Sequence, residues 1–108
     1  MKESVLVTKM IELIRTRGGY AENIWGGGFQ SAGIPDILAC YKGVFMGIEV
    51  KVGKNKPSAL QKAKVKLINQ AGGLAVVTWD DTEQLKAMLD YIDHKAGGHK
   101  SVLDATIR

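Results

Sequence analysis

The chain of 108 residues contains one cysteine, two histidines and two prolines, and its hydrophobic residues form no long run. Cys40 cannot close an internal disulfide and lies in an apolar stretch, so we expect it to be a buried structural thiol. No apolar run approaches the roughly 20 residues of a membrane helix. Residues 1–4 also lack the apolar stretch of a signal peptide, so we expect a cytoplasmic protein without a membrane partner.

Several kinds of site are missing as well. With one cysteine and two histidines, His94 and His99, the chain offers no ligand set for a zinc site. It has no Ser-His-Asp arrangement for acyl transfer and no G-x-x-x-x-G-K motif for nucleotide binding. Length and composition indicate one globular domain with a single core.

Acidic residues are absent between Glu49 and Asp80, where six lysines occur: Lys51, Lys54, Lys56, Lys62, Lys64 and Lys66. The formal net charge is +4. A block of one charge sign beside a possible active site favours a polyanionic partner. A solvated lysine face that serves only solubility is the alternative.

Hydrophobic periodicity predicts three helices and four strands. The helices are expected at residues 3–17 and about 58–71, and after the N-cap candidates Asp80, Asp81 and Thr82. Their apolar stripes are Leu6, Met10, Leu13 and Ile14 in the first, Leu60, Ala63, Leu67 and Ile68 in the second, and Leu85, Met88, Leu89 and Ile92 in the third. The strands are expected at residues 20–25, 36–41, 44–51 and 74–79, the last of them buried. The glycine-rich stretch 26–33 is expected to be a mobile loop.

This order, αβββαβα, predicts the α/β class, with a mixed sheet of about four strands covered by helices. The first three strands can form an antiparallel meander, and residues 44–79 should form a right-handed parallel crossover. We expect the domain to span residues 1–96. The tail, residues 97–108, is expected to be disordered or to pack on a partner subunit.

The hairpin between the second and third strands brings two carboxylates together. If its turn is centred between Lys42 and Gly43, Asp36 lies directly opposite Glu49. Like charges in that position destabilise a sheet, and a divalent cation between them removes the penalty. Lys51 lies on the same face of the strand as Glu49. Two carboxylates can hold Mg²⁺ or Mn²⁺ through oxygen, and a lysine can stabilise charge on a phosphate during hydrolysis. The alternative is an exposed Glu49–Lys51 pair on an edge strand.

The segments Gly33-Ile34-Pro35-Asp36 and Ile48-Glu49-Val50-Lys51 resemble the PD-(D/E)xK nuclease superfamily in its Glu-x-Lys form. The most similar branch is the VRR-NUC domain, particularly its stand-alone phage and bacterial members. The resemblance extends from Glu3 to about Leu89 and implies a restriction-endonuclease-like core. The stretch that gives the branch its name corresponds only to Val77-Thr78-Trp79, which departs from the pattern.

The resemblance implies roles for further residues. The Val50 carbonyl would join Asp36 and Glu49 as a metal ligand, and Glu3 would contribute to the metal site, often through water. Glu3 has a second interpretation, which is a favourable charge in the first turn of a helix. Gln61 would act in the active site, although Ser58-Ala59-Leu60-Gln61 also matches a helix capping box. Contacts with the DNA backbone are expected from Ser31, Lys54, Lys56, Lys62 and Lys64.

The function expected from this resemblance is that of a Mg²⁺- or Mn²⁺-dependent endodeoxyribonuclease, in which Asp36, Glu49, Lys51 and Gln61 are catalytic. Stand-alone relatives suggest a homodimer, acting in a bacterial or phage-infected cell, that cuts branched DNA such as four-way (Holliday) junctions. Three alternatives remain: a DNA-binding module without catalysis, a nuclease subunit of a larger restriction or repair assembly, and a protein-binding module with a basic surface.

Overall fold

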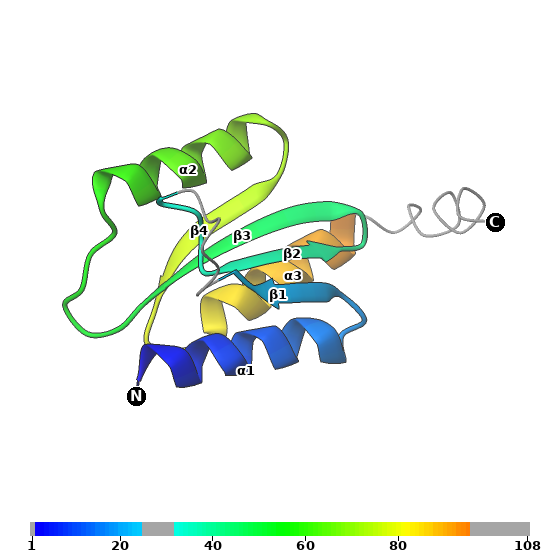
Figure 1. Cartoon of the computed structure of the whole chain (residues 1–108). Helices are drawn as coiled ribbons and strands as arrows, with labels where there is room; N and C mark the ends of the chain where they lie inside the picture. Colours follow the sequence, from blue (N-terminus) through cyan, green and yellow to red (C-terminus); the bar gives the residue numbers. More distant parts are fainter. Residues whose placement is uncertain (1, 25–31, 96–108) are drawn as a thin grey trace.

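The computed structural model describes residues 2–24 and 32–95. Its helices are α1 (Glu3–Thr16), α2 (Ala59–Gln70) and α3 (Glu83–Lys95). Its strands are β1 (Tyr20–Asn23), β2 (Ile37–Tyr41), β3 (Val44–Lys51) and β4 (Leu74–Trp79). The predicted α/β class and element order are confirmed (Figure 1). No helix in these residues is both long and apolar enough to cross a membrane. Most of the glycine-rich stretch and the C-terminal tail lie outside the described residues.

The four strands form one mixed sheet in the order β1-β2-β3-β4. Strands β1, β2 and β3 form the predicted antiparallel meander, and β4 runs parallel to β3 after the crossover through α2. The prediction that residues 74–79 form a buried strand is wrong. Because β4 pairs only with β3, it lies at an edge of the sheet, and only two of its six residues are buried.

The turn between β2 and β3 fixes the register of the site. Lys42 and Gly43 have φ values of 48° and 84°, which are the left-handed conformations of a two-residue hairpin turn. The pairs that follow run from Tyr41 with Val44 to Ile37 with Ile48. This is the predicted register. The ladder stops one residue short of Asp36, so β2 begins at Ile37 rather than at the predicted residue 36.

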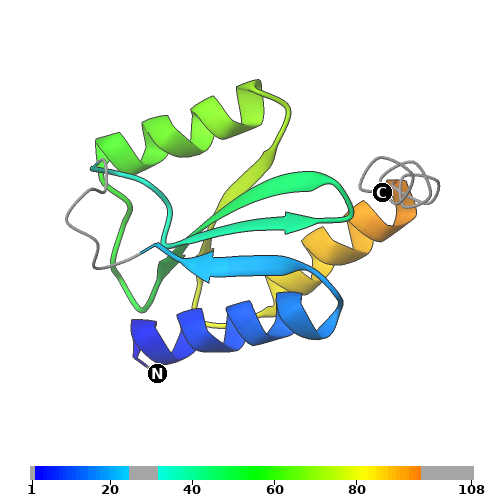
Figure 2. The ribbon, with the colours of Figure 1, turned by 45° about the vertical axis from the view of Figure 1, so that its right-hand side comes forward.

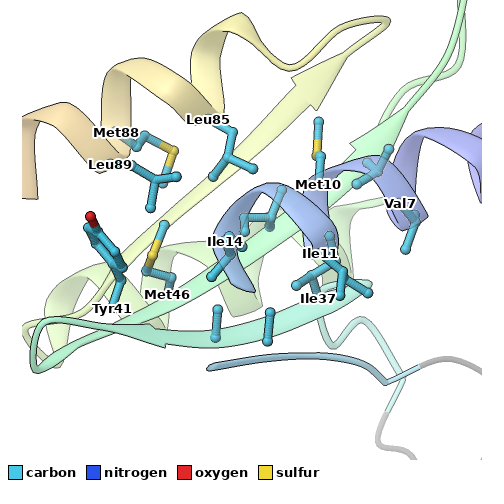
Figure 3. Packing of buried hydrophobic residues seen from close by; sticks show 14 of the residues in the cluster. Val7, Met10, Ile11, Ile14, Ile37, Tyr41, Met46, Leu85, Met88 and Leu89 are labelled. Carbon is cyan, nitrogen blue, oxygen red and sulfur yellow. The ribbon is translucent and has the colours of Figure 1, made fainter. Parts of the chain in front are cut away.

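Helices α1 and α3 cover one face of the sheet, and α2 covers part of the other (Figures 1 and 2). Side chains of α1 and α3 meet the inward-facing residues of β2 and β3 in the core (Figure 3). The predicted stripe of α3 is fully confirmed, and that of α1 is confirmed except for Leu13, which is only partly buried. The core residues include Leu6, Met10, Ile14, Ile37, Met46, Ile48, Leu85 and Leu89.

The opposite face contradicts two predictions. Helix α2 has no buried residue, so its apolar stripe is not a core stripe: Leu60 is 46% and Leu67 56% exposed. Cys40 is exposed rather than buried. Alternation along β2 turns Cys40 away from α1 and α3, toward the face that α2 covers. That helix lies over β3 and β4, and among the described residues no helix covers β1 and β2 on this face.

Candidate active site

Glu49 and Lys51 project from the end of β3 on the α2 face of the sheet. Their neighbours Ile48 and Val50 point into the core on the other face, as the alternation of a strand requires. Glu49 is only 1% exposed, and it is one of two buried polar side chains in the described residues. An edge-strand surface pair is therefore excluded for Glu49 and Lys51, because both side chains are shielded from water.

The two oxygens of the Glu49 carboxylate have different surroundings. Oε2 lies 3.0 Å from Lys51 Nζ and accepts a hydrogen bond of 3.0 Å from Gln61 Nε2. Oε1 is buried and has no hydrogen-bond partner among the described residues. A buried carboxylate oxygen without a partner is costly. One oxygen is thus held in place by protein groups, and the other has no partner among the described residues.

Gln61 forms the capping box that the sequence indicated, and its side chain also reaches Glu49. Its backbone N–H donates to Ser58 Oγ (3.1 Å), and its side-chain Oε1 accepts from the Ser58 N–H (2.8 Å), which completes the capping box at the start of α2. The amide nitrogen of the same side chain reaches Glu49. The cap therefore fixes the orientation of the amide group that binds the carboxylate.

Asp36 is anchored between β1 and β3. Its carbonyl accepts from the Ile24 N–H (2.9 Å), and its Oδ2 accepts from the Val50 N–H (2.8 Å). In the β2–β3 register the next hydrogen-bonded pair would join Val50 with Pro35. Proline has no N–H to donate, so the Val50 carbonyl receives no ladder hydrogen bond at this position. The Pro35-Asp36 sequence thereby ends the backbone hydrogen bonding between β2 and β3 next to Glu49.

The start of α1 forms a further wall of the site. A pocket of about 260 Å³ is lined by Glu3, Ser4, Val7, Asn23 and Asp36. Glu3 therefore faces the same space as Asp36. The described residues contain no group of three or more acidic, histidine or cysteine side chains close enough to hold a metal ion. A metal at this site would need main-chain or water ligands in addition to carboxylates.

Asn23 was not among the residues singled out from the sequence. It lies at the end of β1 and lines the pocket with Glu3 and Asp36. Its proximity depends on the pairing of β1 with β2, across the segment 25–31 that the structure does not describe. The sequence predicts this pairing as part of the meander, but it does not set the register that brings Asn23 next to Ile37.

The predicted DNA-contacting residues fall into three groups. Lys54, Lys56 and Lys62 are exposed on the loop after β3 and at the start of α2. Lys64 is half-buried and lines a hollow with Leu38, Phe45 and other apolar residues. Ser31 lies outside the described residues.

Burial is the largest of the causes that raise the pKa of Glu49 from its ordinary value of 4.5 to about 7, and the nearby carboxylate of Asp36 acts in the same direction. The ammonium group of Lys51 acts in the opposite direction. Without a bound cation, Glu49 is therefore protonated in part near neutral pH. A cation at Oε1 would favour the ionised form.

Comparison with known proteins supports the fold. No protein-family model and no curated protein gives a significant match to the sequence. Among solved structures, a VRR_NUC domain aligns with a TM-score of 0.65 and 22% identity, over 82% of this chain and 94% of the other. The chain therefore shares the fold of a VRR-NUC domain. Hjc, a Holliday junction resolvase from Archaeoglobus fulgidus, aligns with a TM-score of 0.55 and 21% identity, over 74% of this chain and 69% of Hjc.

The raised pKa of Glu49 predicts how stability depends on pH in metal-free buffer. Between pH 4.5 and about 7 the folded chain binds more protons at Glu49 than the unfolded chain does. This contribution to the free energy of unfolding is therefore complete below pH 4.5 and is lost as pH rises through 7. The loss should be on the order of 3 kcal/mol, because one pKa unit corresponds to about 1.4 kcal/mol.

Urea denaturation at pH 5, 6, 7 and 8 measures this effect, with Glu49→Gln as the matched control that cannot ionise. Relative to wild type, the variant should gain stability as pH rises. A difference between the two proteins that does not change with pH would contradict the account of Glu49.

Proposed function

We propose that this chain is a divalent-metal-dependent nuclease that hydrolyses phosphodiester bonds in DNA. The observation that supports it most strongly is the buried Glu49 Oε1, which has no hydrogen-bond partner among the described residues. Asp36 lies close enough to Glu49 to raise the pKa of its carboxyl group, and the Val50 carbonyl has no ladder donor at Pro35. These three groups fit the preference of Mg²⁺ or Mn²⁺ for oxygen ligands, with waters and Glu3 completing the shell.

A bound divalent ion would polarise the scissile phosphate and lower the pKa of a coordinated water. The residues of the chain prepare the site for it. Lys51 stabilises the ionised form of Glu49 and presents an amine beside the metal-binding oxygens, where it can stabilise developing charge on a phosphate oxygen. Gln61 holds the second oxygen of Glu49 so that Oε1 keeps its direction.

The substrate is proposed to be branched DNA, such as a four-way junction. Exposed Lys54, Lys56 and Lys62 extend a positive surface from the site, suited to phosphates. The name of the Hjc neighbour, a Holliday junction resolvase, supports the choice of substrate. A DNA-binding module without catalysis would have no need of the arrangement of Lys51 and Gln61 around Glu49.

We further propose that the protein acts as a two-fold homodimer joined through the uncovered part of the sheet. Tyr20 (64% exposed) and Phe45 (47%) lie on this face with Cys40. Two adjoining hollows share Leu38 and Phe45; one also contains Glu22 and the other Lys64. A two-fold axis between the hollows would place Glu22 opposite Lys64 of a second copy, with apolar contacts between them.

The nuclease assignment predicts that cleavage requires both the metal and Lys51. Four-way junction, flap, linear duplex and single-stranded DNA are incubated with Mg²⁺, Mn²⁺ or EDTA. We expect nicking of the junction that EDTA abolishes. Lys51→Ala should lower the rate by at least about 100-fold, because the group that stabilises the phosphate charge is lost.

Lys86→Ala is the matched control for that experiment. Lys86 belongs to α3, which covers the opposite face of the sheet, and its amine pairs only with the exposed Glu83 in the described residues. This variant should cut at the wild-type rate. Cleavage by Lys51→Ala as fast as by wild type, or cleavage that persists in EDTA, would refute the proposed nuclease mechanism.

The dimer proposal predicts that a charge on the uncovered face separates the subunits. Phe45→Glu should shift the protein toward monomer in sedimentation equilibrium, because the charge would be buried between two apolar faces. Tyr91→Glu, at an exposed aromatic residue on α3, should remain dimeric. A wild-type protein that is monomeric at tens of micromolar, or equal behaviour of the two variants, would contradict this interface.

A further inference from the structure

The loop between β3 and α2, residues 52–57 (the lysine loop), connects two parts of the candidate site. Lys51 directly precedes it, and Ser58, which caps α2 together with Gln61, directly follows it. The loop itself carries Lys54 and Lys56, both exposed. Its conformation therefore decides how these two lysines are placed relative to Glu49 and its partners.

Two side chains from the end of β4 hold this loop at separate points. Asp80 Oδ1 accepts a hydrogen bond of 2.9 Å from the Gly53 N–H. Trp79 Nε1 donates one of 2.9 Å to the carbonyl of Asn55. The backbone N–H of Asp80 also donates to the Lys51 carbonyl, at 3.2 Å. The end of β4 thus contacts the loop on both sides of Lys54.

Asp80 is placed for this contact by an uncommon backbone conformation. Its φ is 61°, in the left-handed region that aspartate and asparagine tolerate better than most residues. The sequence suggested Asp80 as an N-cap of α3, but that helix takes its side-chain contact from Asp81, whose Oδ1 accepts from the Glu83 N–H at 3.1 Å. The carboxylate of Asp80 is directed to the lysine loop instead.

The side chain of Trp79 is also directed to the lysine loop. The indole ring is 40% exposed, so it is not a core residue, and its one polar group binds the loop. A loop held by hydrogen bonds from a rigid strand loses less conformational entropy when it binds a ligand. This applies most to a loop rich in lysine, because free lysine side chains and a free backbone must both be ordered on contact with phosphate.

We propose that Trp79 and Asp80 are positioning residues that hold the lysine loop in the conformation that binds the DNA phosphate backbone. They act through Lys54 and Lys56 and do not themselves contact the reacting phosphate. The proposal rests on the nuclease function proposed above. A carboxylate beside a DNA-binding loop repels phosphate, so a purely electrostatic role for Asp80 predicts that any neutral replacement strengthens DNA binding.

The decisive comparison is Asp80→Gly against Asp80→Asn. Both residues are neutral and both accept the left-handed conformation, but only asparagine keeps an oxygen that can accept from the Gly53 N–H. In Ca²⁺ or EDTA, so that no cleavage occurs, Asp80→Gly should weaken binding to a four-way junction by about three- to tenfold. Asp80→Asn should bind within about twofold of wild type. In cleavage assays, Asp80→Gly should raise KM while changing kcat less than twofold.

Two further measurements test whether Asp80 affects DNA binding through Lys54 and Lys56. In Asp80→Gly, the slope of log Kd against log salt should become shallower, because fewer phosphate contacts are made. Lys54→Ala should cost less affinity in the Asp80→Gly background than in wild type, a non-additivity expected of coupled residues. Trp79→Phe, which keeps an aromatic ring but loses the N–H donor and part of the indole surface, provides an independent variant and should weaken binding in the same direction.

Amide hydrogen exchange at Gly53 separates failure of this proposal from failure of the nuclease function. Exchange at Gly53 should be faster in Asp80→Gly than in Asp80→Asn and wild type, whether or not the protein cuts DNA. Equal DNA affinity of the two Asp80 variants, or tighter binding by both than by wild type, would overturn the positioning role. If wild type binds no DNA, the proposed nuclease function and the proposed role of Trp79 and Asp80 in DNA binding are both wrong. Exchange at Gly53 then still shows whether Asp80 holds the lysine loop.

Discussion

The carboxylate of Glu49 is buried at the end of a sheet beside a second carboxylate, and the rest of the site is arranged around it. An ionised carboxylate is stable in such a place only when charges and hydrogen bonds replace the lost water. Lys51 and Gln61 do so for one oxygen, and the described residues supply no partner for the other. Because the lost water is only partly replaced, the pKa of Glu49 is raised. A divalent cation at Oε1 would supply the missing partner.

The fold brings these groups together through a few local devices. The Lys42-Gly43 turn sets the register that places Asp36 next to Glu49. Gly47 allows α2 to approach the sheet closely, since a Cβ there would lie 2.8 Å from Ile68 Cδ1. That approach brings the start of α2, with Gln61, over the end of β3. The capping box that begins the helix then orients the amide toward Glu49.

Features encoded locally could be predicted from the sequence. The stripe of α3, the hairpin turn and the register of the β2–β3 hairpin depend on residues close together in the chain. Features that depend on which helix covers which face of the sheet could not be predicted from the sequence. The apolar residues of α2 follow the same period as a core helix, and Cys40 lies in the same kind of apolar run as buried residues. Only the tertiary arrangement shows that Cys40 is exposed and that no side chain of α2 is fully buried.

The same limit applies to single polar residues. Asp80 was interpreted as a helix cap because it precedes a helix, whereas its partner is Gly53, far away in the sequence. Asn23 enters the site through the pairing of β1 with β2. Gln61 has one partner nearby in the sequence and one far away. Its side-chain carbonyl oxygen accepts from Ser58, and its amide nitrogen donates to Glu49.

The most direct test of the central claim is a crystal structure of the protein grown with Mn²⁺, with anomalous scattering used to locate the ion. We predict an anomalous peak that places Mn²⁺ at about 2.0–2.3 Å from Glu49 Oε1, from the Asp36 carboxylate and from the Val50 carbonyl, as expected for such oxygen ligands. Saturating Mn²⁺ that binds only elsewhere, or leaves Glu49 Oε1 without a ligand, would contradict the account.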